Sequence, residues 1–173
     1  MHTLIVGPRQ VGKSTLIRRV VRALDCSVRG FETKKEDALR AEGTDSPIYL
    51  YPAGQARKAG EGLAVGRSDG RRPTVFAPAF DRAAALLGPE AQSGDLILMD
   101  ELGTMESASP IFCAAVLRCL DGETPILAAV KDRDTAFLNT VRNHPNCRCF
   151  WITEENREEL FGVVLDFVTR QLT

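Results

Sequence analysis

The stretch GPRQVGKST, Gly7 to Thr15, decides the fold, and it follows directly after the apolar run HTLIV at the start of the chain. Its pattern, Gly7-x-x-x-x-Gly12-Lys13-Ser14, matches the P-loop, and its context is the required one, a predicted strand before and a predicted helix after. Such a loop wraps closely around phosphate oxygens and holds them mainly through backbone N–H groups. The N-terminus of the following helix adds a partial positive charge of roughly half an elementary unit. The stretch therefore predicts a phosphate-binding site.

Individual side chains of this loop have separate expected roles. Lys13 is placed to bridge the β- and γ-phosphates of a nucleotide and to act in catalysis, and the Ser14 hydroxyl to bind Mg²⁺. Thr15 is expected to pack against the fold or to cap the helix. The residues predicted to bind the nucleotide in this loop are Gly7, Pro8, Arg9, Gln10, Val11, Gly12, Lys13, Ser14 and Thr15.

A second motif, LILMDE, is an apolar run that ends in the acidic pair Asp100 and Glu101. Asp100 is the predicted anchor for Mg²⁺, and Glu101 is placed to orient and polarise an attacking water molecule. On its own, a strand end followed by two solvated acids is common and indicates little. Together with the P-loop it favours hydrolysis of a phosphate bond, because simple nucleotide kinases usually manage without such a base.

Length and composition predict one globular domain, residues 1–173, that is 44% hydrophobic and 26% charged. With a formal net charge of −1, the chain is not expected to bind nucleic acid or an anionic membrane. No apolar run approaches the ~18 residues of a spanning helix, and the N-terminal run leads straight into the glycine motif, so we expect a cytoplasmic protein. Five cysteines without a C-x-x-C pair and two histidines predict neither a structural metal nor a disulfide framework.

Strand-like and helix-like segments alternate along the chain. The predicted strands are HTLIV, CSVRGFET, PIYLYP, DLILM, PILAAV and CRCFWIT; the predicted helices are TLIRRVVRAL, SPIFCAAVLRCL, DTAFLNTVRN and NREELFGVVLDFVTRQL. Asp134 is the expected N-cap of the third helix, and the second has an apolar stripe that begins at Ile111 and ends at Leu120. The consecutive apolar residues of DLILM are typical of a parallel strand covered on both faces. The predicted fold is therefore α/β, a mostly parallel sheet wrapped by helices in three layers.

Other candidates follow later strands, and parallel strands direct such segments to one crevice. Lys131 comes after PILAAV and has two readings, a sensor of the γ-phosphate or an ordinary surface lysine. Asn156 comes after CRCFWIT, and it either contacts the nucleotide base or caps the last helix, with Glu159 three residues on in a capping-box-like arrangement.

The middle of the chain, residues 36–70, is rich in Gly, Ala and charge and is interrupted only by PIYLYP, so we expect it to be largely irregular. The stretch GRSDGRRP carries Arg67, Arg71 and Arg72. It is either a solvated basic loop or a flap whose arginines reach the phosphates.

Three segments, RGFET, MDELGTME and VRNHPNCRCFWITEENREEL, resemble the thermophilic-type (cancer-related) nucleoside-triphosphatase family of P-loop proteins. The resemblance covers Met1 to about Thr33 and Asp95 to the C-terminus. It implies a fold with an additional strand between the P-loop strand and the acidic-motif strand. It further implies slow Mg²⁺-dependent hydrolysis of ATP, GTP and other nucleoside triphosphates to diphosphates, with weak base selectivity. Glu106 and Asn156 fall on motif positions of that family.

The chain also departs from the family pattern. Arg9 and Gln10 stand where the family's P-loop usually has small residues, and KKEDALRAEGTDSP replaces an expected glycine- and arginine-rich hairpin. These departures leave open the substrate preference and the identity of any catalytic arginine. The alternatives to hydrolysis are a nucleotide or small-molecule kinase, or a nucleotide-dependent switch module.

Overall fold

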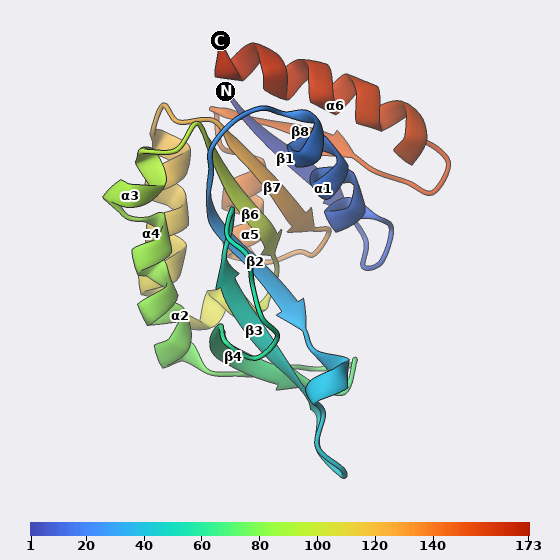
Figure 1. The fold of residues 1–173 in the computed structure, drawn as a ribbon, viewed down its shortest axis with the longest axis vertical. Helices are drawn as coiled ribbons and strands as arrows, with labels where there is room; N and C mark the ends of the chain where they lie inside the picture. The colour runs from blue at the N-terminus through green and yellow to red at the C-terminus, as the bar shows by residue number, and fades with distance from the viewer.

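The computed structural model describes all residues from Met1 to Thr173 and contains one eight-stranded sheet with helices on both faces (Figure 1). The strands are β1 (His2–Gly7), β2 (Val28–Lys35), β3 (Ser46–Pro52), β4 (Leu63–Ser68), β5 (Thr74–Val75), β6 (Leu96–Leu102), β7 (Ile126–Lys131) and β8 (Cys147–Trp151). The helices are α1 (Lys13–Ala23), α2 (Ala77–Ala83), α3 (Pro89–Gln92), α4 (Pro110–Asp121), α5 (Ala136–Arg142) and α6 (Arg157–Leu172). Short 3-10 turns are η1 (Asp37–Leu39), η2 (Ala84–Leu87) and η3 (Met105–Ala108). None of the helices is long and apolar enough to cross a membrane.

The strand order is β5-β4-β3-β2-β6-β7-β1-β8. β2, β6, β7, β1 and β8 run parallel to their neighbours in this order, whereas β3, β4 and β5 add an antiparallel extension beyond β2. β7 lies between the P-loop strand β1 and the acidic-motif strand β6, so the predicted additional-strand arrangement is confirmed. The predicted α/β fold with a mostly parallel sheet is confirmed as well.

Each face of the sheet has its own apolar core. In β6, Ile97 and Met99 pack on the face covered by α2, α4 and α5, while Leu96 and Leu98 pack on the face covered by α1 and α6. Because alternate side chains of a strand point to opposite faces, a strand made only of apolar residues is buried on both faces of the sheet. This double burial holds the strand ends in place, and with them the loops that form the site.

Two details of the helices differ from expectation. The N-cap of α5 is Thr135, whose hydroxyl accepts a hydrogen bond from the Leu138 N–H at 3.2 Å. The prediction of Asp134 as the cap was wrong, because its carboxylate instead accepts a hydrogen bond from the Asn139 side chain at 2.7 Å. In α4, Ile111 is 57% exposed, so the buried stripe begins one residue later, at Phe112.

The segment from residue 36 to 70 contains one strand that was not predicted, β4. β3 and β4 form an antiparallel pair within it, in which Ser46 lies opposite Ser68 and Leu50 opposite Leu63. The expected short strand PIYLYP is confirmed as the greater part of β3. This extension places β2, β3 and β4 beside the acidic end of β6, where they complete the wall of a cavity.

Candidate nucleotide site

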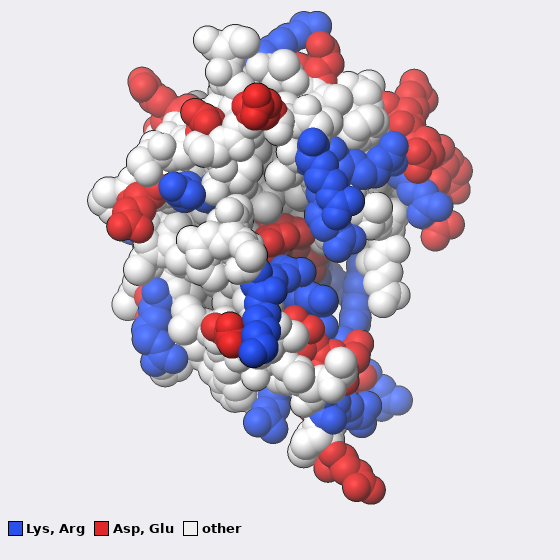
Figure 2. All heavy atoms as spheres, viewed as in Figure 1, with Lys and Arg blue, Asp and Glu red and all other residues white.

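A cavity with a volume of about 590 Å³ lies beyond the carboxyl ends of β1, β6 and β7. Lys and Arg side chains gather around the middle of the face drawn in Figure 2, with acidic side chains between them. The wall of the cavity is made by Pro8, Arg9, Gln10, Gly12, Lys13, Ser14, Thr15, Thr33, Lys35, Ile48, Ser68, Arg71, Pro73, Asp100, Glu101, Gly103, Thr104, Met105, Glu106, Lys131, Asp132 and Arg133. The P-loop, the acidic pair and Lys131 therefore meet in one crevice.

Lys13 lies inside the P-loop and is only 4% exposed. Its Nζ donates hydrogen bonds to the backbone oxygens of Gly7 at 2.9 Å and Pro8 at 2.6 Å. Burial lowers the pKa of Lys13, and the nearby carboxylate of Glu101 opposes that change. The loop around it contains two residues with positive φ, Gln10 at 60° and Gly12 at 109°. The ammonium is thus held within the concave side of the loop, where phosphate oxygens would bind.

Ser14 and Asp100 form the adjoining part of the site. The Ser14 hydroxyl donates a hydrogen bond to Oδ1 of Asp100 at 2.8 Å. Asp100 is 7% exposed, and burial raises its pKa to about 6. A buried carboxylate beside a hydroxyl is an oxygen-donor pair suited to Mg²⁺, which prefers hard oxygen ligands. The fold has no group of three or more His, Cys, Asp or Glu residues that could hold a metal alone. The pair fits a Mg²⁺ ion that also takes ligands from bound phosphates, as is usual for nucleotide sites.

Glu101 lies between two lysines. Its Oε2 is 3.5 Å from Nζ of Lys13, and its Oε1 is 3.1 Å from Nζ of Lys131. Lys131 therefore has a contact inside the site, and whether it senses the γ-phosphate stays a prediction. The Arg142 side chain of α5 donates to the Lys131 backbone oxygen at 3.1 Å and to that of Arg133 at 2.8 Å, which holds the loop after β7 in place.

Glu106 is the most buried acid of the cavity wall, with an exposure of 3%. Its Oε2 accepts a hydrogen bond from the Gly103 N–H at 2.8 Å, which closes the turn between β6 and η3. Burial raises the pKa of Glu106 to about 7. Apart from the family resemblance, nothing in the sequence pointed to this residue, since one glutamate after a glycine carries no local signal.

Asn156 lies outside the cavity wall. Its side chain does not cap α6, so the predicted capping box was wrong. Instead Oδ1 accepts from the Thr153 N–H at 2.8 Å and Nδ2 donates to the Trp151 backbone oxygen at 2.9 Å, which closes the turn after β8. A smaller hollow of about 310 Å³ lies beside the P-loop and is lined by Gly12, Thr15, Leu16, Arg19, Arg157 and Glu158.

The basic stretch GRSDGRRP, which begins at the end of β4, contributes one of its three arginines to the cavity wall, Arg71, while Arg67 and Arg72 lie outside it. The turn does touch the P-loop, because Nη1 of Arg9 donates to the backbone oxygen of Gly70 at 2.6 Å. The sequence did not point to the wall residues Thr33 and Lys35 of β2, Ile48 of β3 and Ser68 of β4, since the pairing that brings β2, β3 and β4 together beside the site was not predicted.

A P-loop after β1, an acidic pair at the end of β6 and a strand inserted between them define a P-loop NTPase of the additional-strand type. Residues 2–165 match the model of the family described as NTPase, and the chain belongs to this family. Its relatives include the nucleoside-triphosphatase THEP1 of Methanopyrus kandleri, 31% identical over 183 residues that cover 99% of this chain and 97% of the relative. The human cancer-related nucleoside-triphosphatase is 29% identical over 191 residues, covering 96% of each chain.

Solved structures share the fold. The crystal structure of THEP1 from Aquifex aeolicus has a TM-score of 0.74 at 22% identity and covers 97% of this chain and 99% of its own. The solution structure of the human cancer-related nucleoside triphosphatase has a TM-score of 0.70 at 24% identity, with 96% of each chain covered. The family resemblance that the motifs carried is thereby confirmed.

Proposed function

We propose that this NTPase hydrolyses Mg²⁺-bound nucleoside 5′-triphosphates, ATP and GTP among them, to the diphosphate and phosphate. The observation that carries the proposal is the position of Glu101. Its carboxylate follows the buried Asp100 directly and lies in the cavity wall 3.5 Å from the P-loop lysine. A carboxylate next to the metal anchor can receive the proton of an attacking water, which a phosphoryl transfer to another substrate does not require at this place.

The remaining residues of the site have complementary roles in this proposal. Backbone N–H groups of the P-loop and the N-terminus of α1 bind the phosphates, and Lys13 bridges the β- and γ-phosphates. Ser14 and Asp100 are the residues that would hold Mg²⁺, and the bound ion would supply positive charge beside the phosphates.

Glu101 orients the water whose oxygen forms a bond to the γ-phosphorus. The bond from that phosphorus to the bridging oxygen breaks, and its electron pair remains on the diphosphate. The proton of the water passes to Glu101 and then to solvent. Water and triphosphate thus give diphosphate, phosphate and one proton, and no further reactant is needed.

Weak selectivity between bases is part of the proposal. The smaller hollow beside Gly12 is the available place for the nucleoside, and its wall includes the surface ion pair of Arg19 with Glu158, 2.9 Å apart. These side chains are largely exposed, whereas strong discrimination needs buried hydrogen-bonding groups that a wrong base leaves unpaired.

The experiment is an acceptor-free assay of phosphate release from Mg²⁺ complexes of ATP, GTP, CTP and UTP, with EDTA as the metal-free control. Phosphate and diphosphate should appear in equal amounts and only when Mg²⁺ is present. Turnover that appears only after addition of a phosphoryl acceptor would replace hydrolysis by the kinase alternative.

A further inference from the structure

Six cationic side chains line the cavity, of which three form ion pairs with carboxylates and three do not. Lys13 and Lys131 both pair with Glu101, and Nζ of Lys35 lies 3.4 Å from Oδ1 of Asp37. The other three are Arg9, Arg71 and Arg133, none of which has a carboxylate within ion-pair distance. The cavity thus holds three guanidinium groups whose charge is not neutralised by the protein.

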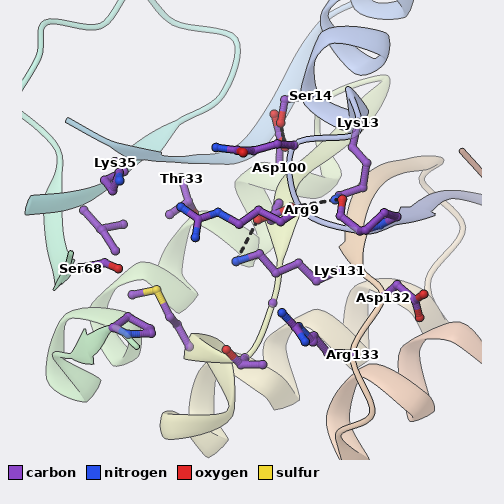
Figure 3. A pocket seen from close by; sticks show the side chains of 18 of the residues that line it. Arg9, Lys13, Ser14, Thr33, Lys35, Ser68, Asp100, Lys131, Asp132 and Arg133 are labelled. Atoms are coloured by element: carbon purple, nitrogen blue, oxygen red, sulfur yellow. Dashed lines mark hydrogen bonds and ion pairs between the residues drawn. The ribbon is translucent and has the colours of Figure 1, made fainter. Parts of the chain in front are cut away.

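Arg9 differs from the other two in being held in place. Its Nη1 donates to the Gly70 backbone oxygen at 2.6 Å, across 61 residues of sequence. Neither Arg71 nor Arg133 uses its guanidinium in a hydrogen bond; both make hydrogen bonds through backbone groups alone. Figure 3 shows the Arg9 side chain reaching out from the P-loop across the cavity, away from Lys13 and toward the side where Thr33 and Ser68 lie.

The single partner of Arg9 leaves its charge available for an anion. A guanidinium has five N–H donors and remains protonated in proteins, and the Gly70 carbonyl is neutral and takes one of those donors. A guanidinium frequently binds a phosphate through two parallel charge-assisted hydrogen bonds, which a single neutral carbonyl cannot accept in the same way. The remaining donors therefore favour a phosphate oxygen, and the contact to Gly70 already fixes the side chain over the cavity.

We propose that Arg9 is the catalytic arginine of this enzyme, supplied in cis by the P-loop itself, and that it contacts oxygens of the γ-phosphate. This inference rests on the proposed hydrolysis. Arg9 forms and breaks no covalent bond; it compensates the negative charge that builds up on the γ-phosphate oxygens in the transition state. Because Arg9 belongs to the loop that wraps the phosphates, it reaches them without a partner subunit. It also replaces Arg67, Arg71 and Arg72 as the leading candidate for that role.

The geometry predicts an effect on rate rather than on ground-state binding. Loss of one preorganised donor to a developing charge lowers kcat by about 10²–10³-fold. Binding of Mg²⁺–ADP, which has no γ-phosphate, should change by less than about threefold, since the interaction is made with the transferred group. Lysine at this position keeps the charge but lacks the planar fork, so Arg9→Lys should recover only part of the rate.

The test compares wild type, Arg9→Ala, Arg9→Lys and the control Arg72→Ala, which removes an exposed arginine near the same turn but outside the cavity wall. Single-turnover phosphate release and titration with Mg²⁺–ADP separate rate from binding. A second readout is the trapping of Mg²⁺–ADP with fluoroaluminate, which imitates the γ-phosphate in the transition state. Wild type and Arg72→Ala should trap ADP, and Arg9→Ala should not. Added guanidinium ion should restore part of the rate of Arg9→Ala.

Three results would overturn the inference while leaving hydrolysis intact. These are an unchanged rate in Arg9→Ala, an equal loss in Arg72→Ala, and a loss in Arg71→Ala that exceeds the loss in Arg9→Ala. If wild type releases no phosphate from any triphosphate, the proposed function itself fails. A fall in Mg²⁺–ADP affinity as large as the fall in rate would show that Arg9 only shapes the P-loop.

Discussion

Replacement of Glu106 by glutamine should stabilise the protein at neutral and alkaline pH and have little effect near pH 4.5. Burial raises the pKa of Glu106 from 4.5 to about 7, so the folded protein holds this proton more tightly than the unfolded chain does. Between these two values the unfolded chain ionises first, and the unfolding free energy of wild type falls as pH rises through that window. A shift of this size corresponds to about 3 kcal/mol at pH values above the folded pKa. Glutamine does not ionise, and its Oε1 can still accept the hydrogen bond of the Gly103 N–H.

The assay is urea unfolding of wild type and Glu106→Gln at a series of pH values from 4.5 to 8.5. The difference in unfolding free energy should grow in favour of the variant by about 3 kcal/mol across the series. The contribution of Asp100, whose pKa is also raised by burial, is common to both proteins and cancels in the difference. Glu42→Gln, which changes an exposed glutamate, should show no such trend. A difference that stays constant from pH 4.5 to 8.5 would refute the reasoning and would mean that Glu106 is ionised in the folded protein at an ordinary pKa.

Three further predictions concern the phosphate cradle, the base site and the sheet. Lys13→Ala should lower the rate of phosphate release by about 10²–10³-fold and weaken triphosphate binding, and a near wild-type rate would remove the P-loop assignment. Rates for ATP, GTP, CTP and UTP should lie close together, and a preference above roughly 10⁴ would show that a buried hydrogen-bonding pocket for one base exists. Gly30→Ala should lower the unfolding free energy by several kcal/mol, on the order of the usual costs of backbone strain and overpacking combined. The reason is that Gly30 has φ 104° and a Cβ there would lie 2.1 Å from the Leu98 backbone oxygen. Gly43→Ala is its control, since Gly43 also has a positive φ of 73° but has open space around it; equal losses of unfolding free energy in urea for the two variants would show that the contact with Leu98 is unimportant.

The parts of the site that sequence predicts well are those whose chemistry is local. The P-loop needs its glycines and Lys13 within one short stretch, and the acidic pair needs only a buried strand before it. The P-loop and the acidic pair can therefore be recognised without knowledge of the tertiary contacts. The order of β1, β7 and β6 followed from the family resemblance, and alternation of strands and helices alone would not have supplied it.

The features of the site that the sequence did not predict depend on contacts between segments far apart in the chain. The strand β4 carries no clear sequence signal, and its pairing with β3 is visible only in the folded sheet, where β3 in turn pairs with the edge of β2. The contact of Arg9 with Gly70 joins residues far apart in sequence, and arginine at that P-loop position seemed only a departure from a pattern. From the sequence, the side chain of Asn156 could contact either a nucleotide base or the first N–H groups of α6. In the folded protein it instead binds backbone groups of Thr153 and Trp151 in the turn after β8.

The central claim is that Glu101 activates the water, and Glu101→Gln tests it most directly. The substitution keeps the shape of the side chain and removes the charge that polarises the water. Asp100→Asn is the matched neighbour, and it should weaken Mg²⁺-dependent nucleotide binding and turnover together, because Asp100 helps to hold the ion.

The measurement is single-turnover phosphate release by Glu101→Gln alongside its titration with the Mg²⁺–triphosphate complex. We expect an affinity close to that of wild type and a rate at least about tenfold lower, within the usual range for the loss of a positioned base. Full activity, or a loss of affinity equal to the loss of rate, would contradict it.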